Sequence, residues 1–150
     1  MHPQFCSIFT DFVDQHKLKD NQFGLEVTET AELADLAVAR ESLELLKSKG
    51  IKIALDDFGA GYASLKYVRE LPIDVVKLDK QFTFNVSDHT TARLISFVSE
   101  LCKDLNLEMI GEGIETEEEK NLMIDLGCKT GQGYLMHRPD FLESFKTKEL

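Results

Sequence analysis

The chain has 150 residues, 43% of them hydrophobic and 29% charged, and its 27 acidic and 17 basic side chains give a formal net charge of −10. This length suits one ordinary domain with a buried core. The acidic balance argues against DNA or RNA as a partner, because nonspecific nucleic-acid binding depends on Lys and Arg neutralising phosphates. A small phosphate-bearing ligand stays compatible with it, because bound metal ions can supply positive charge.

The sequence shows no sign of a membrane or secreted protein. No apolar run approaches the roughly 18 residues of a membrane span, and residues 1–5 do not open a signal peptide. We therefore expect a cytoplasmic protein with no membrane partner. The three cysteines, Cys6, Cys102 and Cys128, lack C-x-x-C spacing, which predicts buried free thiols rather than disulfides or a zinc site.

Short apolar runs alternate with longer amphipathic ones along the chain. A helix is expected first, over residues 5–17, with no strand ahead of it. The short runs predict buried parallel strands over residues 24–28, 51–55, 75–78, 107–110 and 133–135. The amphipathic runs predict helices over residues 31–49, 62–70, 91–105 and 116–126.

Local signals support this alternation. Gly50 follows the second helix as a stop, and Thr116 with Glu119 forms a capping box at the start of the last one. Repeated strand–helix units predict an α/β fold: a partial TIM-type (β/α) barrel of about five parallel strand–helix units. A complete barrel takes about 250 residues, more than this chain has. We treat residues 1–150 as one unit, because no linker or composition break divides them.

Polar side chains gather where the predicted strands end. They are Glu26 and Glu29, Asp56 and Asp57, Lys77 and Asp79, Glu112 and Glu115, and Gln132. Because the carboxyl ends of parallel strands share one face, we expect these groups in one pocket. Crowded carboxylates repel one another, and Mg²⁺ or Mn²⁺ would compensate them. Two such ions suit phosphodiester cleavage, with Lys77 holding or polarising the attacking water.

Each of these residues also has an ordinary interpretation. A strand-end Asp or Glu often caps a helix or forms a surface salt bridge. Glu29 could stabilise the following helix through its dipole, and Asp79 could pair with Lys80. The occurrence of such groups at four successive strand ends favours a functional role for the set.

Five segments resemble EAL-domain cyclic di-GMP phosphodiesterases in order and spacing. The most specific is Asp-Asp-Phe-Gly-Ala-Gly-Tyr at residues 56–62, which is similar to the family's D-D-F-G-x-G-Y signature. The others are residues 25–29 (L-E-x-T-E), 77–82 (K-x-D-x-x-F), 111–116 (similar to A-E-G-V-E-T) and 131–134 with Pro139 (G-Q-G-Y…P). The resemblance covers about residues 25–139 and implies a partial EAL domain.

The resemblance implies a role for each matched residue. It implies metal ligands at Glu26, Asp56, Asp57 and Glu112, with Asp56 bridging two Mg²⁺ or Mn²⁺ ions. Lys77 would position the nucleophilic water, and Glu112 would be the candidate general base. The implied substrate-binding or supporting residues are Glu29, Asp79, Glu115, Gln132, Gly133 and Pro139. The implied activity is hydrolysis of cyclic di-GMP to the linear dinucleotide pGpG.

The departures from the family pattern leave alternatives open. The E-A-L and N-x-S segments, which precede L-E-x-T-E in the family, are absent, so one metal site is expected to be incomplete. An opened barrel would expose strand edges, which predicts self-association or pairing with a complementary chain. Besides the phosphodiesterase, a catalytically inactive remnant that binds cyclic di-GMP or a protein as a regulator remains open. Enolase-like proton abstraction is disfavoured by the D-D-F-G and G-Q-G-Y motifs.

Overall fold

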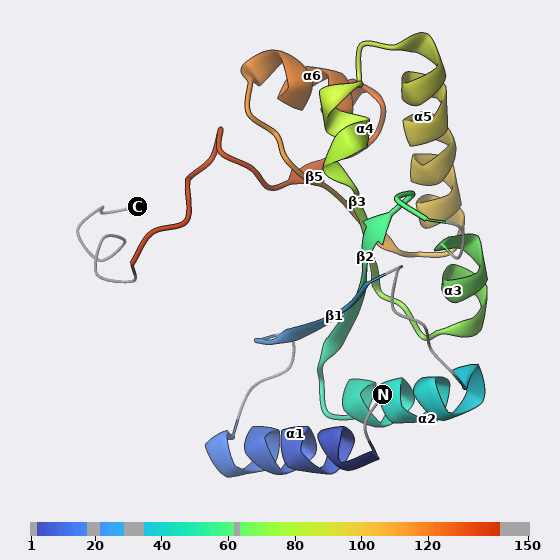
Figure 1. The fold of residues 1–150 in the computed structure, drawn as a ribbon, viewed down its shortest axis with the longest axis vertical. Coiled ribbons are helices and arrows are strands. Elements are labelled where there is room, and N and C mark those ends of the chain that lie inside the picture. The colour runs from blue at the N-terminus through green and yellow to red at the C-terminus, as the bar shows by residue number, and fades with distance from the viewer. Residues whose placement is uncertain (1–2, 18–21, 29–34, 62–63, 142–150) are drawn as a thin grey trace.

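The fold is an α/β half-barrel built on one parallel sheet. The computed structural model describes residues 3–17, 22–28, 35–61 and 64–141. Five strands pair in parallel in the order β1-β2-β3-β4-β5 (Figure 1). They are β1 (Gly24–Thr28), β2 (Lys52–Phe58), β3 (Val75–Leu78), β4 (Glu108–Gly111) and β5 (Thr130–Gly131). The prediction of a partial barrel of five parallel units is confirmed.

Helices precede and separate the strands. They are α1 (Pro3–His16), α2 (Leu36–Lys47), α3 (Ser64–Glu70), α4 (Lys80–Phe84), α5 (His89–Asp104) and α6 (Glu117–Asp125). The predicted capping box at Thr116 is confirmed. Helix α2 ends before the predicted stop, with Ser48 as its C-cap, and Gly50 lies in the following turn with φ 77°. Residues 31–34 and 62–63, where two helices were predicted to begin, lie outside the described residues. Helix α4 was not predicted, because it is only one short turn after Asp79.

Two strand predictions change in the structure. The second strand runs on through Asp56 and Asp57 to Phe58, after a register shift between Leu55 and Phe58. Asp57 has φ 55°, so the extra residue of a bulge lets pairing resume with β3. The prediction of a strand at 133–135 is wrong. Strand β5 ends at Gly131, and the Gln132 carbonyl and the Leu135 N–H form hydrogen bonds with the Ile114 backbone in the loop after β4.

The core fills the space between the sheet and the helices along its outer side. Helices α2, α3 and α5 lie together on one side of the strands (Figure 1). Side chains with essentially no exposure come from α2, β2, β3 and α5: Leu43, Leu46, Ile53, Leu55, Leu78 and Ile95. In the described part of the chain, no helix is both long and apolar enough to span a membrane.

The cysteines take part in this core as thiols. Cys6, Cys102 and Cys128 are buried and form no disulfide with one another, as the sequence predicts. Burial raises the pKa of the Cys102 and Cys128 thiols to about 11. Both therefore stay protonated near neutral pH, where a thiol is a small apolar group rather than a nucleophile.

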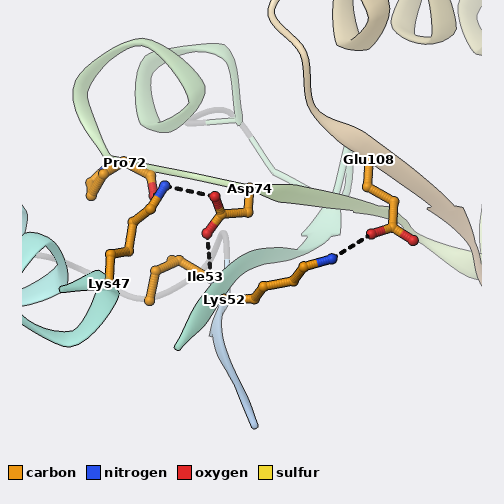
Figure 2. A network of polar contacts seen from close by, with 6 residues as sticks. All are labelled: Lys47, Lys52, Ile53, Pro72, Asp74 and Glu108. Atoms are coloured by element: carbon orange, nitrogen blue, oxygen red, sulfur yellow. Dashed lines mark hydrogen bonds and ion pairs between the residues drawn. The ribbon is translucent and has the colours of Figure 1, made fainter. Parts of the chain in front are cut away.

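A polar network ties the amino-terminal ends of β2 and β3 to α2 (Figure 2). Asp74 Oδ2 accepts a hydrogen bond from the Ile53 backbone N–H at 2.9 Å, and the Asp74 N–H donates to the Ile53 carbonyl at 2.8 Å. Lys47 Nζ donates to Asp74 Oδ1 at 2.7 Å and to the Pro72 carbonyl at 3.1 Å. The nearby Lys52–Glu108 pair, at 3.1 Å, is more exposed.

We expect Asp74→Ala to lower the free energy of unfolding by about 1–3 kcal/mol, because it removes the acceptor of the Ile53 N–H and the carboxylate that pairs with the Lys47 ammonium. Urea unfolding followed by circular dichroism measures this. Asp74→Asn keeps an acceptor oxygen and should cost less. Lys52→Met, in the exposed pair, should change stability by less than about 1 kcal/mol. Equal losses for Asp74→Ala and Lys52→Met would contradict this account.

Candidate functional site

The centre of the site is the buried side chain of Lys77, on β3. Its ammonium lies 2.7 Å from Glu26 Oε1, 2.8 Å from Asp56 Oδ1 and 2.8 Å from Glu112 Oε1. Glu26 belongs to β1, Asp56 to β2, and Glu112 follows β4 directly. Four neighbouring strands therefore bring one cation and three carboxylates together, and Lys77 is 6% exposed in the middle of them.

Three carboxylates form a tighter group within this arrangement. Asp56, Asp57 and Glu112 each offer an oxygen within 4.8 Å of the other two. Asp57 reaches this group because its backbone is in the left-handed region, with φ 55°, which turns consecutive aspartates toward one side of β2. Glu26 is not part of this group, and its side chain is 53% exposed. It reaches the site through the Lys77 ammonium.

The charges of the site are strongly coupled. Burial raises the pKa of Glu112, and Asp56 and Asp57 raise it further against the opposing effect of Lys77. Burial also raises the pKa of Asp57, with contributions from Asp56 and Asp79. Burial alone would lower the pKa of Lys77, but its hydrogen bonds with the surrounding carboxylates outweigh this and hold it above its usual range. The ammonium is therefore a permanent charge here.

The acidic group suits a hard divalent cation. The four carboxylates of Glu26, Asp56, Asp57 and Glu112 face a single ammonium, so the set carries excess negative charge. Asp56 Oδ1 is buried and, although Lys77 Nζ lies nearby, it accepts no hydrogen bond of good geometry from the described residues. Buried carboxylate oxygens with spare lone pairs are the ligands that Mg²⁺ and Mn²⁺ prefer. The donor set therefore fits such an ion.

The remaining candidate residues lie beside the triad. Gln132 Nε2 donates to Glu112 Oε1 at 2.5 Å. A groove of about 510 Å³ begins at this pair. Five predicted site residues line it, namely Glu112, Glu115, Gln132, Gly133 and Pro139. Gly133 packs so closely on the Ile114 backbone that a Cβ would overlap it.

Among the described residues, the predicted site residue Asp79 does not line this groove. Asp79 caps α4, where its side chain accepts a hydrogen bond from the Gln81 N–H at 2.8 Å. Asp79 therefore acts as a helix cap, which is one of the ordinary interpretations of a strand-end aspartate. Its charge still helps to raise the pKa of Asp57. Glu29 lies outside the residues that the structure describes.

Five residues that line the groove were not among the predicted site residues: Lys80, Phe84, Gly113, Tyr134 and His137. Tyr134 belongs to the G-Q-G-Y motif and Lys80 follows Asp79, so their neighbours could have pointed to them. Arg138 stacks over the Tyr134 ring, 4.3 Å from its centroid, and holds that wall of the groove. Phe84 and His137 reach the groove only through α4 and the turn after β5, which no sequence signal marked.

The sequence model of the EAL domain family matches residues 1–139 of this chain. The chain belongs to the EAL domain family. The match extends beyond the motif region recognised in the sequence and includes α1. The half-barrel and its carboxylate-lined strand ends are thus those of an EAL domain.

Relatives of this EAL domain are longer proteins. The uncharacterized protein Rv1354c of Mycobacterium tuberculosis is 36% identical over 136 residues, which are 90% of this chain and 22% of the relative. The bifunctional diguanylate cyclase/cyclic di-GMP phosphodiesterase MucR of Pseudomonas aeruginosa is 37% identical over 126 residues, 83% of this chain and 18% of MucR. The chain thus spans about a fifth of the length of these relatives.

Solved structures share the fold. The EAL domain of Mycobacterium smegmatis DcpA superposes with a TM-score of 0.91 at 28% identity, covering 98% of this chain and 66% of DcpA's. The MucR phosphodiesterase in complex with c-di-GMP gives 0.86 at 34% identity, covering 96% and 59%. Klebsiella pneumoniae BlrP1 with manganese and c-di-GMP gives 0.83 at 32% identity, covering 92% and 36%. Two of these three structures, those of MucR and BlrP1, are complexes with c-di-GMP.

The turn that follows Asp57 depends on a glycine. Gly59 has φ 94°, and a Cβ there would overlap the Phe82 ring. We expect Gly59→Ala to lower the free energy of unfolding by about 1–3 kcal/mol, because alanine is strained at this φ and must displace Phe82. Urea unfolding tests this. Gly24→Ala is the control, because its Cβ would meet Lys52 O at an ordinary 3.7 Å; an equal loss there would contradict the explanation.

Proposed function

We propose that residues 1–150 act as a partial EAL domain, a cytoplasmic metal-dependent phosphodiesterase that hydrolyses cyclic di-GMP to pGpG. The observation that carries this proposal is the convergence of Asp56, Asp57 and Glu112 around the buried Lys77 ammonium at the carboxyl ends of the strands. The likeness to the MucR phosphodiesterase in complex with c-di-GMP supports the choice of substrate.

The proposed metal ligands are Asp56, Asp57 and Glu112, with Glu26 as a ligand of a second, incomplete site. Mg²⁺ or Mn²⁺ held by these oxygens would neutralise negative charge that develops on the phosphate. BlrP1, whose structures with c-di-GMP contain manganese or calcium, supports a divalent ion. The carboxylates would hold such an ion beside Lys77, and the ion would bind the phosphate there.

Proton handling is assigned to two of the central residues. Lys77 stays charged, so it serves as a hydrogen-bond donor that orients the attacking water rather than as a base. Glu112 is the proposed general base, because burial and neighbouring carboxylates raise its pKa above its usual value. Gln132, bonded to Glu112 Oε1, fixes the orientation of that carboxylate.

The groove beside the triad is the proposed place for the rest of the substrate. Glu115, Gln132, Gly133 and Pro139 line it and would contact the nucleotide. Lys80, on the same wall, offers a cation for the second phosphate. Asp79 supports the site by capping α4 and through its charge, and Glu29 is proposed as a supporting residue from the motif alone.

Incubation of the chain with cyclic di-GMP and Mn²⁺ or Mg²⁺, followed by chromatography, should show pGpG. Asp56→Ala should reduce turnover by about 100-fold or more, because it removes the shared ligand, and EDTA should abolish it. Lys52→Met, remote from the triad, is the matched control and should stay active. Product that persists in Asp56→Ala would indicate a contaminating enzyme and contradict the assignment.

A second candidate is an inactive EAL domain that binds cyclic di-GMP or a protein as a regulator. It is favoured by the position of Glu26, which lies outside the acidic triad and contacts Lys77 instead. Calorimetric binding of cyclic di-GMP by a folded chain that yields no product would select this candidate over the phosphodiesterase.

Self-association, or pairing with a complementary chain, is proposed from the open sheet. Among the described residues β1 pairs only with β2, and β5 only with β4. Both outer edges therefore present unpaired backbone groups, which strands tend to cover by pairing. Sedimentation velocity at micromolar concentration should show a dimer or larger species. A single monomeric species over that range would contradict self-association.

A further inference from the structure

The Lys77 ammonium uses the same oxygen-bearing side chains that a metal ion would use. Two of its three carboxylate partners, Asp56 and Glu112, are also members of the acidic triad. Its third partner, Glu26, is not. Lys77 thus connects the triad to Glu26, a carboxylate outside it. Asp56 and Glu112 belong both to the triad and to the carboxylates that contact Lys77.

We propose that Lys77 is an internal cation that holds these carboxylates together before metal binds and competes with the metal for Asp56 and Glu112. When an ion binds to the triad, Lys77 gives up these two partners and keeps Glu26 for as long as the second, incomplete site is empty. This inference rests on the proposed function of the site and concerns how that site is regulated. It makes Lys77 the residue that sets the metal affinity of the domain, in addition to its proposed contact with water.

The placement of Lys77 explains why it competes instead of moving away. It lies in the middle of β3, all of whose residues are buried, and its backbone pairs with Ile110 of β4. The ammonium is therefore tethered beside the triad. Glu26 lies at the edge strand, with a side chain 53% exposed, so it can follow the ammonium when the other two carboxylates turn toward a metal.

The charges of the site predict the direction in which Lys77 changes the affinity for a metal ion. A positive charge a few ångströms from a cation site opposes cation binding, strongly so where burial reduces screening. Without Lys77, the carboxylates of Glu26, Asp56, Asp57 and Glu112 would face one another uncompensated. The metal-free protein would then be less stable, and its affinity for a divalent ion would be higher.

The test is Mn²⁺ binding by electron paramagnetic resonance and calorimetry, with melting temperatures in EDTA and in Mn²⁺. Lys77→Met should bind Mn²⁺ about tenfold or more tightly than the unchanged chain, melt lower in EDTA and gain more from Mn²⁺. Lys77→Arg keeps the charge and should bind like the unchanged chain. Lys52→Met is the matched control for net charge, since Lys52 pairs with Glu108 at the other end of the sheet, and should leave affinity unchanged.

Equal or weaker Mn²⁺ binding by a folded Lys77→Met would overturn the competition. Lys77→Arg binding as tightly as Lys77→Met would overturn it as well, because charge would not be the cause. If Lys77→Met does not fold, the Lys77 side-chain ¹⁵N resonance of the unchanged chain decides. It should shift on Mg²⁺ addition while that of Lys52 stays; metal binding without such a shift overturns the proposal.

The outcome separates this inference from the proposed function. If Lys77→Met binds Mn²⁺ more tightly but no pGpG forms, the competing role of Lys77 is supported and only the phosphodiesterase proposal is contradicted. If the unchanged chain hydrolyses cyclic di-GMP and Lys77→Met has unchanged Mn²⁺ affinity, only the proposed competition is contradicted. Absence of Mn²⁺ binding in both the unchanged chain and Lys77→Met overturns both, because no metal site would then exist for either proposal.

Discussion

The organisation of this domain depends on the ion pairs between the buried Lys77 ammonium and the surrounding carboxylates. A charge in the interior is tolerated only where it is paired, and breaking such a pair by removing one partner costs about 3–5 kcal/mol in typical proteins. Here the partners come from β1, β2 and the end of β4, so satisfying one side chain of β3 requires four strand ends to meet. The same requirement assembles the acidic face.

The two ends of the sheet have different electrostatic balance. At the amino-terminal ends, Lys47 meets Asp74, Lys52 meets Glu108, and Asp74 also holds the Ile53 backbone. These contacts pair opposite charges or satisfy the backbone, and they serve stability. At the carboxyl ends, carboxylates outnumber the single ammonium of Lys77. This division between a stabilising and a functional end is typical of (β/α) barrels.

Sequence reasoning recovered most of the sheet and missed details that depend on distant contacts. Strands 24–28 and 75–78 are read correctly from their apolar runs, because burial leaves a direct mark on composition. The strand at 133–135 was misplaced, because β5 has only two residues and is defined by pairing with Ile110 and Gly111. The continuation of β2 to Phe58 depends on a bulge whose pairing partner lies on β3.

The candidate residues Glu26, Asp56, Asp57, Lys77 and Glu112 could be selected from the sequence, because each stands at or near the end of a predicted strand. Their arrangement is visible only in the folded chain, where three carboxylates form one triad and Glu26 is joined to it through Lys77. The physical reason is that strand order and register set which side chains face each other, whereas the distances between them follow from twist, bulges and competition for one shared ammonium.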